Sequence, residues 1–257
     1  MSRGRKHLVV PDTQIKPGVP LDHIDWIAKF AIEKRPDVIV LIGDWADMSS
    51  LSSYDIGRKS FEGRQIAADL KCANDALGRL FGPIDAESKR RRDKHRERWE
   101  PEKHITLGNH EYRIERAVDQ DRKLEGMISP KSLHFEENGI KVHPFLQPAV
   151  IDGIAYCHYF VSGVMGRPIT TARALLGKQH MSCFAGHQQG NDIAYAKRGD
   201  GKRMTAIIAG SCYLHDEDYL NHQSNNCWRG VYMLHEVNDG SFDEMPVSLS
   251  FLKERYS

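Results

Sequence analysis

The first half of the chain alternates short apolar runs with longer stretches in which apolar residues recur at helical spacing. A short apolar run between polar flanks predicts a buried strand, and the three- and four-residue spacing predicts a helix with one buried face. Because helices alternate with the strands, we expect parallel strands joined by right-handed crossovers. The pattern predicts strands at 6–10, 37–42 and 104–107, and helices at 21–34, 61–81 and from 110 to 123.

After Gly139 the pattern changes to short strands separated by turns. Asp-Gly pairs at 152–153 and 239–240 lie between apolar segments, and this dipeptide is typical of a tight hairpin turn. We find no internal repeat, low-complexity linker or domain boundary in the sequence, so we expect residues 1–257 to form one α/β domain. The strands predicted in this half are 149–151, 154–158, 181–185, 192–196, 204–209, 230–237 and 247–252.

Five polar clusters lie where predicted strands end. Loops at the carboxyl ends of strands are the usual place for ligand sites in α/β sheets. Asp, Asn, His and Gln side chains supply the oxygen and nitrogen ligands of hard or borderline divalent metals. A carboxylate shared between two ions about 3.5–4 Å apart is the core of two-metal phosphoryl chemistry. The clusters are Asp12-Thr13-Gln14, Gly43-Asp44-Trp45-Ala46-Asp47, Gly108-Asn109-His110-Glu111, His158, and Gly186-His187-Gln188-Gln189.

In this order the clusters resemble the motifs of the calcineurin-like metallophosphoesterase superfamily, which are D-x-H, G-D-x-x-D, G-N-H-[DE], a lone H and G-H-x-H. The resemblance spans roughly Lys6 to Gln189. It implies an α/β fold of four layers, in which two facing mixed β-sheets are flanked by helices. It also implies two metal ions that activate a water to hydrolyse phosphate esters. Gln14 and Gln189 depart from the pattern, because each stands in place of a histidine.

The resemblance implies a role for most of the polar residues of the clusters. His110 would lie beside the scissile phosphate, where an imidazole stabilises charge or protonates the leaving oxygen. Asp47 would orient a ligand or the start of a helix. Asp44 would bridge both ions, because one carboxylate has two oxygens. The first ion would be held by Asp12, Gln14 and Asp44, with Gln189 as a candidate fourth ligand, and the second by Asp44, Asn109, His158 and His187.

Glutamine in place of histidine exchanges an imidazole nitrogen for a neutral amide oxygen. Oxygen-rich sites favour Mn²⁺ or Mg²⁺ over Zn²⁺. We therefore expect two divalent metal ions with Mn²⁺ favoured, while Mg²⁺, Zn²⁺ and iron stay open. One family of the superfamily, the manganese-dependent ADP-ribose/CDP-alcohol phosphohydrolases, has a similar D-x-Q start, so Gln14 is compatible with activity.

Positive charge is concentrated in one segment. The net charge is +1, but residues 89–98 carry seven Lys or Arg against two acids, a local +5 that leaves −4 on the remainder. We predict a basic helical insert at about residues 83–100, and because it lies between the second and third clusters we expect it to project near the site. Such a run is either a solvated helix face or a contact for a nucleic-acid backbone. The candidate contacts are Arg90, Arg91 and Arg92, together with Arg113, three residues after His110.

The sequence leaves three functions open. The basic run favours a nuclease that hydrolyses nucleic-acid phosphodiesters, so nucleic acid is the expected partner and substrate. The G-N-H-E motif also suits a phosphomonoesterase such as a protein Ser/Thr phosphatase. Gln14 and Gln189 favour a third alternative, a catalytically silent binding scaffold.

Composition bears on where the protein works. The five cysteines are scattered, the apolar runs are too short to span a bilayer, and the N-terminus lacks the apolar core of a signal peptide. These features predict a cytoplasmic protein without a membrane partner, and they predict nothing about its oligomeric state. His215 and His222 lie in a polar loop and are expected at the surface or at the rim of the substrate site.

Overall fold

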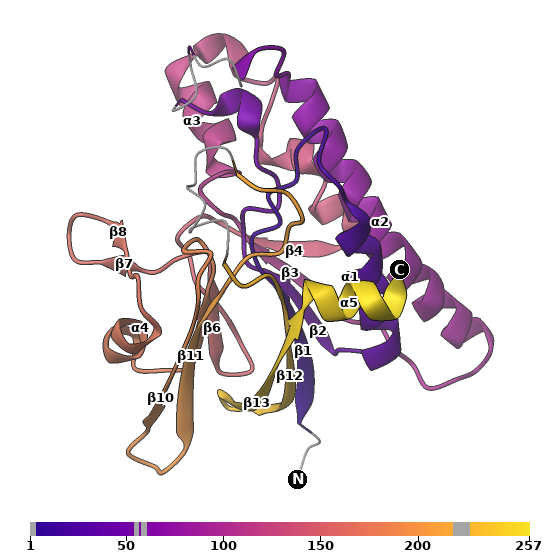
Figure 1. The fold of residues 1–257 in the computed structure, drawn as a ribbon, viewed down its shortest axis with the longest axis vertical. Coiled ribbons are helices and arrows are strands. Elements are labelled where there is room, and N and C mark those ends of the chain that lie inside the picture. Colours follow the sequence, from indigo (N-terminus) through magenta and orange to yellow (C-terminus); the bar gives the residue numbers. More distant parts are fainter. Residues whose placement is uncertain (1–3, 54–56, 58–60, 218–226) are drawn as a thin grey trace.

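A six-stranded sheet forms the centre of the molecule (Figure 1). The computed structural model describes residues 4–53, 57, 61–217 and 227–257. The strand order is β13-β12-β1-β2-β3-β4, with β1 to β4 parallel, β12 antiparallel to β1, and β13 antiparallel to β12. The strands are β1 (Arg5–Val10), β2 (Val38–Leu41), β3 (Glu102–Thr106), β4 (Ile140–His143), β12 (Gly230–Asn238) and β13 (Ser241–Ser248).

A five-stranded sheet in the order β10-β11-β9-β6-β5 faces the first one. Its inner strands β6, β9 and β11 are parallel, and its edge strands β5 and β10 are antiparallel to their neighbours. Both sheets are therefore mixed. The strands are β5 (Ala149–Ile151), β6 (Ile154–Cys157), β9 (Cys183–Ala185), β10 (Asn191–Lys197) and β11 (Arg203–Ala209), and a separate hairpin is formed by β7 (Val161–Ser162) and β8 (Arg167–Pro168).

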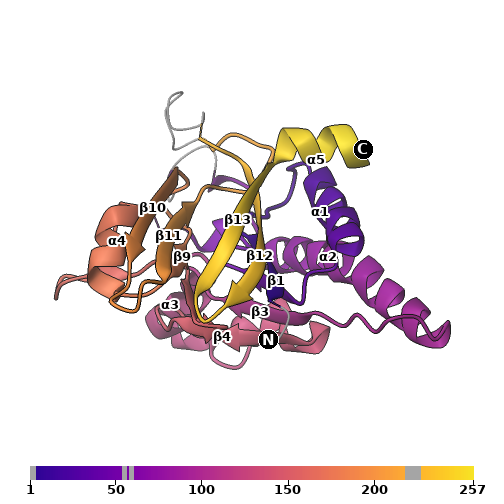
Figure 2. The same ribbon diagram turned by 90° about the horizontal axis from the view of Figure 1, so that it is seen from below.

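Helices cover the outer faces of both sheets, so the molecule has four layers (Figure 2). The helices α1, α2 and α5 pack against the six-stranded sheet, and α4 packs against the five-stranded sheet. This confirms the predicted four-layer α/β architecture. The helices are α1 (Asp22–Lys34), α2 (Ile66–Asp93), α3 (Tyr112–Gln120), α4 (Ala172–Gln179) and α5 (Leu249–Tyr256), and the short 3₁₀ turns are Ser49–Leu51, Arg122–Leu124, Pro130–Leu133 and Glu136–Asn138.

The central strands divide their apolar side chains between two cores, because successive side chains of a strand point to opposite faces. In β1, Leu8 and Val10 face the helices, whereas Val9 faces the second sheet. In β2, Ile39 faces the helices and Val40 faces the second sheet. Strands buried on both faces are continuous apolar runs, which is why the sequence pattern located them. None of the helices in the described part of the chain has the length and apolar character needed to cross a bilayer.

The two helices predicted on either side of Pro83 are one helix, α2. Leu80, Phe81 and Ile84 are fully or almost fully buried around the proline, and this packing outweighs the missing N–H. The helix ends at Asp93, so only the first half of the predicted basic helix is helical.

The strand predicted at 247–252 is wrong after Ser248. Strand β13 ends at Ser248, and α5 begins at the next residue. The hydroxyl of Ser248 accepts a hydrogen bond from the Phe251 N–H (3.2 Å), which is a helix N-cap. Both predicted Asp-Gly hairpins are confirmed, with Asp152 and Asp239 in the left-handed region at φ 50° and 48°.

A buried polar bridge at His7 joins the two sheets. The imidazole is fully buried in β1, with Nδ1 2.7 Å from the hydroxyl of Tyr156 on β6 and Nε2 2.8 Å from Asp152 Oδ2 in the β5–β6 turn. Burial lowers the pKa of His7, against the opposing effect of Asp152. A neutral ring therefore donates from Nε2 to Asp152 and accepts the Tyr156 O–H at Nδ1.

Replacing the bridge should destabilise the fold. In His7→Leu the buried hydroxyl of Tyr156 loses its partner, so the free energy of unfolding should fall by about 1–3 kcal/mol in a urea titration. The double variant His7→Leu/Tyr156→Phe should lose less than the sum of the single changes, because it leaves no orphaned hydroxyl. Additive losses would show that the two side chains are not coupled.

Candidate metal centre

The five polar clusters meet at one edge of the molecule, where β1, β2, β3, β6 and β9 end. The N–H of His187, after β9, donates to both carboxylate oxygens of Asp12, after β1 (3.2 and 2.9 Å). The N–H of His110, after β3, donates to Asp44 Oδ1, after β2 (3.0 Å). The N–H of Gln14 donates to the Asp44 carbonyl (2.8 Å). Side chains far apart in the sequence are thereby held against one another.

Two glycines make this approach sterically feasible. A Cβ on Gly108 would overlap Asp44 Oδ1, and a Cβ on Gly186 would overlap Asp12 Oδ1. In both places the backbone of one cluster touches the carboxylate of another. The glycines of the G-N-H-E and G-H-x-Q motifs are therefore needed to bring these loops together.

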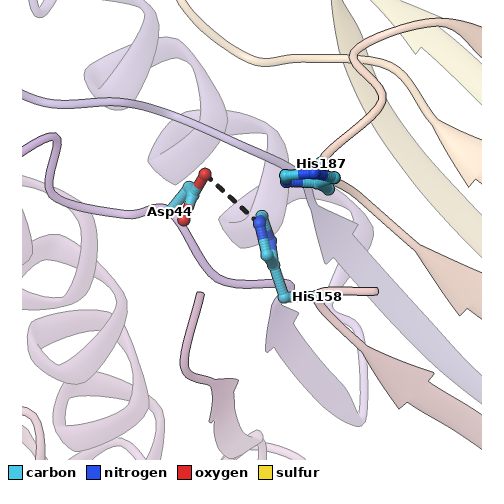
Figure 3. A group of neighbouring side chains, drawn as sticks. All are labelled: Asp44, His158 and His187. Atoms are coloured by element: carbon cyan, nitrogen blue, oxygen red, sulfur yellow. Dashed lines mark ion pairs between the residues drawn. The ribbon is translucent and has the colours of Figure 1, made fainter. Parts of the chain in front are cut away.

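His158 carries the most informative geometry of the site. Its Nδ1 lies 2.9 Å from the Ile42 carbonyl, so Nδ1–H donates to that oxygen. Its Nε2 lies 3.0 Å from Asn109 Oδ1 and 3.2 Å from Asp44 Oδ2, as Figure 3 shows for the Asp44 pair. Both of these partners are acceptors, so positive charge is required at the point where the three atoms converge.

The donor set fits a divalent metal ion. Asp44, His158 and His187 offer ligand atoms that all lie within 4.8 Å of one another, and the two histidine rings approach edge to face beside the carboxylate (Figure 3). Asn109 adds an amide oxygen 3.0 Å from His158 Nε2. One carboxylate, one amide oxygen and two imidazoles suit borderline ions such as Mn²⁺, Fe²⁺ or Zn²⁺.

The electrostatics of the cluster also favour a cation. Burial raises the pKa of the Asp12 carboxyl to about 7, His158 opposes this, and the charge of Asp44 raises it further. Burial alone would raise the pKa of Asp44, but the imidazoles of His110 and His158 hold it well below its usual value. Burial alone would lower the pKa of His158, but Asp44 and Asp12 raise it to about 10. Burial, helped by the charge of His158, lowers the pKa of His187 to about 4, so that ring is neutral.

Glu111 is a structural residue that the sequence analysis left without a role. Its fully buried carboxylate accepts hydrogen bonds from the N–H groups of Asp44 (3.0 Å), Ala46 (2.9 Å) and Gly108 (2.7 Å). It therefore ties the loop after β2 to the loop after β3. The acid at the last position of the G-N-H-E motif was the sequence signal for this role, because an acid there has backbone donors within reach.

The two unusual glutamines lie in different surroundings. Gln14 has a left-handed backbone (φ 43°) and is buried, and its Oε1 has no hydrogen-bond partner among the described residues. A buried amide oxygen without a partner is costly, so Gln14 is suited to a metal ion. Gln189 Oε1 accepts a hydrogen bond from the Tyr213 hydroxyl (2.8 Å), so it already has a partner within the fold.

His110 is held by Asp47 and Arg113. Its Nδ1 lies 2.9 Å from Asp47 Oδ1, and its Nε2 lies 3.7 Å from Asp44 Oδ2 and 3.1 Å from Arg113 Nη2. Arg113 also donates from Nη1 to the Asp47 carbonyl (2.7 Å) and carboxylate (3.1 Å). Burial opposes a charge on the ring, but Asp44 and Asp47 raise the pKa of His110. Asp47 thus orients His110 rather than a helix start, and Arg113 is a neighbour of His110.

A second set of ion pairs, which the sequence did not predict, links Asp47 to Glu217 through Lys16. The Lys16 ammonium lies 3.3 Å from Asp47 Oδ2 and donates to both oxygens of Glu217 (2.9 and 2.7 Å). Glu217 Oε1 lies 2.6 Å from His215 Nε2, and His215 stacks on Tyr213. The side chain of His215 is only 9% exposed, so the surface alternative is wrong for His215, and a place at the rim of the substrate site stays a prediction. His222 lies outside the described residues.

The basic run lies at the opposite end of the sheet from the candidate metal centre. The strands β1 to β3 are parallel, and α2 runs back from their carboxyl ends, so residues 89–98 lie where β3 begins (Figure 1). Trp99 Nε1 donates to the Pro36 carbonyl (2.7 Å), just before β2. The expectation that this run projects near the site is wrong.

The three candidate arginines of the run have partners within the fold. Arg91 is buried and donates to the Glu97 carbonyl (2.8 Å). Arg90 donates to both Glu87 oxygens, and Arg92 donates to Glu100 (3.1 Å). Arg91 is therefore a structural residue, whereas Arg90 and Arg92 belong to a solvated helix end.

No protein-family model and no curated protein matches the chain. Solved structures with similar folds include the phosphoesterase YfcE from E. coli, 14% identical, with a TM-score of 0.40 over 95% of this chain and 99% of that chain. They also include a dimetal phosphatase from Danio rerio, 10% identical, with a TM-score of 0.44 over 96% of this chain and 100% of that chain. Because these identities and TM-scores are low, conclusions about this chain rest on its own geometry.

Metal binding should release a proton from His158. With a pKa raised to about 10, the ring is protonated at neutral pH, and a metal ion needs the free Nε2 lone pair. Affinity for Mn²⁺ should therefore rise with pH between 7 and 9, with about one proton released from His158 when the ion that it holds binds. Calorimetric titrations in two buffers of different ionisation enthalpy measure this number. A metal affinity independent of pH would argue against His158 as a ligand.

Gln14→His should raise the affinity for Zn²⁺ relative to Mn²⁺, because an imidazole nitrogen replaces the unpartnered amide oxygen. Competition between the two ions measures the ratio. Gln120→His, at the exposed end of α3, is the matched control and should leave the ratio unchanged. An equal ratio in all three proteins would place Gln14 outside the metal centre.

Proposed function

We propose that this chain is a metal-dependent phosphoesterase of the calcineurin-like type. The observation that carries the proposal is the convergence of His158 Nε2 with Asn109 Oδ1 and Asp44 Oδ2, within 3.0 and 3.2 Å, beside His187. This set combines the third, fourth and fifth clusters with the carboxylate of the second. The four-layer fold supports the same proposal, because it places all five clusters at one edge.

Two groups of residues would hold the metal ions. Asn109, His158 and His187 would hold one ion together with Asp44. Asp12 and Gln14 would hold a second ion with the same carboxylate, and the unpartnered Gln14 Oε1 supports this. Divalent ions at such a centre polarise the phosphate and supply a nucleophile at neutral pH. The oxygen-rich ligand set supports Mn²⁺ as the favoured ion.

The protein's own contribution to the reaction would come mainly from His110 and Arg113. His110 lies against Asp44 at one side of the centre, and Asp47 fixes the orientation of its ring through Nδ1. Its Nε2, which accepts an Arg113 N–H in this arrangement, would pass a proton to a leaving oxygen or stabilise charge on the phosphate once Arg113 turns to the phosphate. Arg113, 3.1 Å from that nitrogen, adds a permanent positive charge at the same point.

For the substrate we propose a phosphodiester of a nucleotide or nucleic acid. The arginines of the basic run do not support this choice, because they lie at the other end of the sheet from the metal centre. The support comes from the cations beside the metal centre, Lys16 and Arg113, which offer charge to a phosphate.

The described cysteines are all free thiols, which supports a reducing, cytoplasmic compartment.

The proposal is tested with three substrates: bis(p-nitrophenyl) phosphate, p-nitrophenyl phosphate and supercoiled plasmid, each with Mn²⁺, Mg²⁺ and Zn²⁺. We expect hydrolysis of the diester with Mn²⁺. Asp44→Asn should lower it more than about a hundredfold, because the shared negative charge of both ions is lost. Asp119→Asn, an exposed acid on α3, is the matched control and should keep full activity.

The outcomes separate the alternatives. Hydrolysis of the monoester alone selects a phosphomonoesterase, and plasmid cleavage extends the substrate to DNA. Metal binding without hydrolysis of any substrate selects a binding scaffold. Diester hydrolysis by Asp44→Asn within about tenfold of the unsubstituted protein would refute a metal centre built on that carboxylate.

A further inference from the structure

A row of aromatic rings leads away from the candidate metal centre. The ring centroids of Tyr159 and His187 lie 4.7 Å apart. Phe145 meets Tyr159 edge to face at 5.5 Å, and Tyr112 stacks on Phe145 at 4.9 Å with an interplanar angle of 26°. The row therefore runs without a break from a candidate metal ligand to the first residue of α3.

The rings come from three different elements, so the row is a feature of the tertiary structure. Tyr112 begins α3, Phe145 follows β4, and Tyr159 follows β6 directly after His158. Each of the three side chains is only partly buried. Among the described residues, the hydroxyl of Tyr159 has no hydrogen-bond partner. A partly exposed aromatic wall beside a polar centre is thus available to a ligand.

A small pocket adjoins the row at Tyr159. It has a volume of about 150 Å³, and its lining is of mixed character: Leu146, Pro148, Phe160 and Val161 are apolar, whereas Cys157 and Gln179 add polar atoms. Leu146 and Val161 are 40% and 41% exposed, so apolar surface continues from the pocket mouth. A metal centre flanked by aromatic rings and a small pocket suits a substrate that is charged at one end and has a flat, weakly polar part at the other.

The chemistry of such a wall selects planar rings. A base that stacks on an aromatic side chain gains about 1–3 kcal/mol, and the gain is largely independent of base identity. Phe145 and Tyr159 meet at 83°, so a base stacked on the face of one ring would lie beside the edge of the other. An alkyl phosphate ester would leave this wall in contact with water.

We propose that Tyr159, with Phe145 and Tyr112, is a stacking platform for the nucleobase of the substrate. This inference rests on the proposed phosphoesterase function, because it places the phosphate at the metal centre. The substrate class is then a nucleotide ester, either a free nucleotide or the terminal nucleotide of a single strand. Tyr159 is the specificity-determining residue, since its ring lies between the metal ligand His187 and Phe145.

Two esters with one leaving group test the platform: thymidine 5′-(p-nitrophenyl phosphate) and methyl p-nitrophenyl phosphate. The readout is the ratio of their KM values, which cancels any effect of a substitution on the metal centre itself. Tyr159→Leu should raise the KM of the thymidine ester relative to the methyl ester by about 5- to 150-fold, the equivalent of one lost base stack. Tyr159→Phe should keep the ratio within about twofold, because the ring is retained.

Phe145→Leu is a second variant that lies farther from the metal ligands, and it should change the ratio in the same direction. Tyr195→Leu is the matched control. Tyr195 is 54% exposed on β10, its ring lies against Arg203, and its loss should leave the ratio unchanged. A Tyr159→Leu enzyme that hydrolyses both esters with the KM ratio of the unsubstituted protein would refute the platform and leave the phosphoesterase function standing.

The failure of the function is recognised separately. If neither ester is hydrolysed with Mn²⁺, Mg²⁺ or Zn²⁺, the proposed function fails, and equilibrium binding of thymidine 5′-monophosphate in the presence of Mn²⁺ decides the platform. If Tyr159→Leu weakens this binding, the platform is supported. If the variant binds the nucleotide as tightly as the unsubstituted protein, the platform is refuted. With an active enzyme, inhibition by a short oligothymidylate points to a strand terminus and inhibition by the mononucleotide alone to a free nucleotide. Inhibition by neither refutes the platform.

Discussion

The carboxylate of Asp44 is the interaction on which the rest of the site depends. Its Oδ1 accepts the N–H of His110 from the loop after β3, and its Oδ2 faces His158 from the second sheet. The backbone N–H of Asp44 donates to the Glu111 carboxylate. One buried negative charge therefore connects both sheets, and the surrounding side chains either neutralise it or fix its direction. A buried carboxylate is stable only when it is paired, so this arrangement favours a cation at the same point.

The packing of the two sheets makes this connection feasible. β1 and β2 end opposite β6 and β9, so loops from both sheets reach the same point. The bridge from His7 to Tyr156 and Asp152 spans the same pair of sheets farther from the site. Glycines at 108 and 186 remove the side chains that would keep the loops apart. Rigid strands thus position the ligands, and the loops supply only short extensions.

The molecule separates its two charged regions. The metal centre lies at the carboxyl ends of the parallel strands, whereas the basic end of α2 lies at their amino ends. Under the proposed function, substrate recognition would use the surroundings of the centre, which are Lys16, Arg113 and the aromatic row ending at Tyr159. A nucleic acid held at the basic end would not lie across the metal centre.

The sequence by itself determined the strand positions of the first half, the two Asp-Gly hairpins and the five clusters, because burial on both faces and turn chemistry are local properties. It could not determine whether Pro83 interrupts a helix, since distant packing around Leu80 and Ile84 decides that. Nor could it locate the basic run, whose distance from the metal centre depends on the direction of α2. Only the tertiary structure shows which groups Glu111 and Tyr159 contact, because their partners come from loops far apart in the chain.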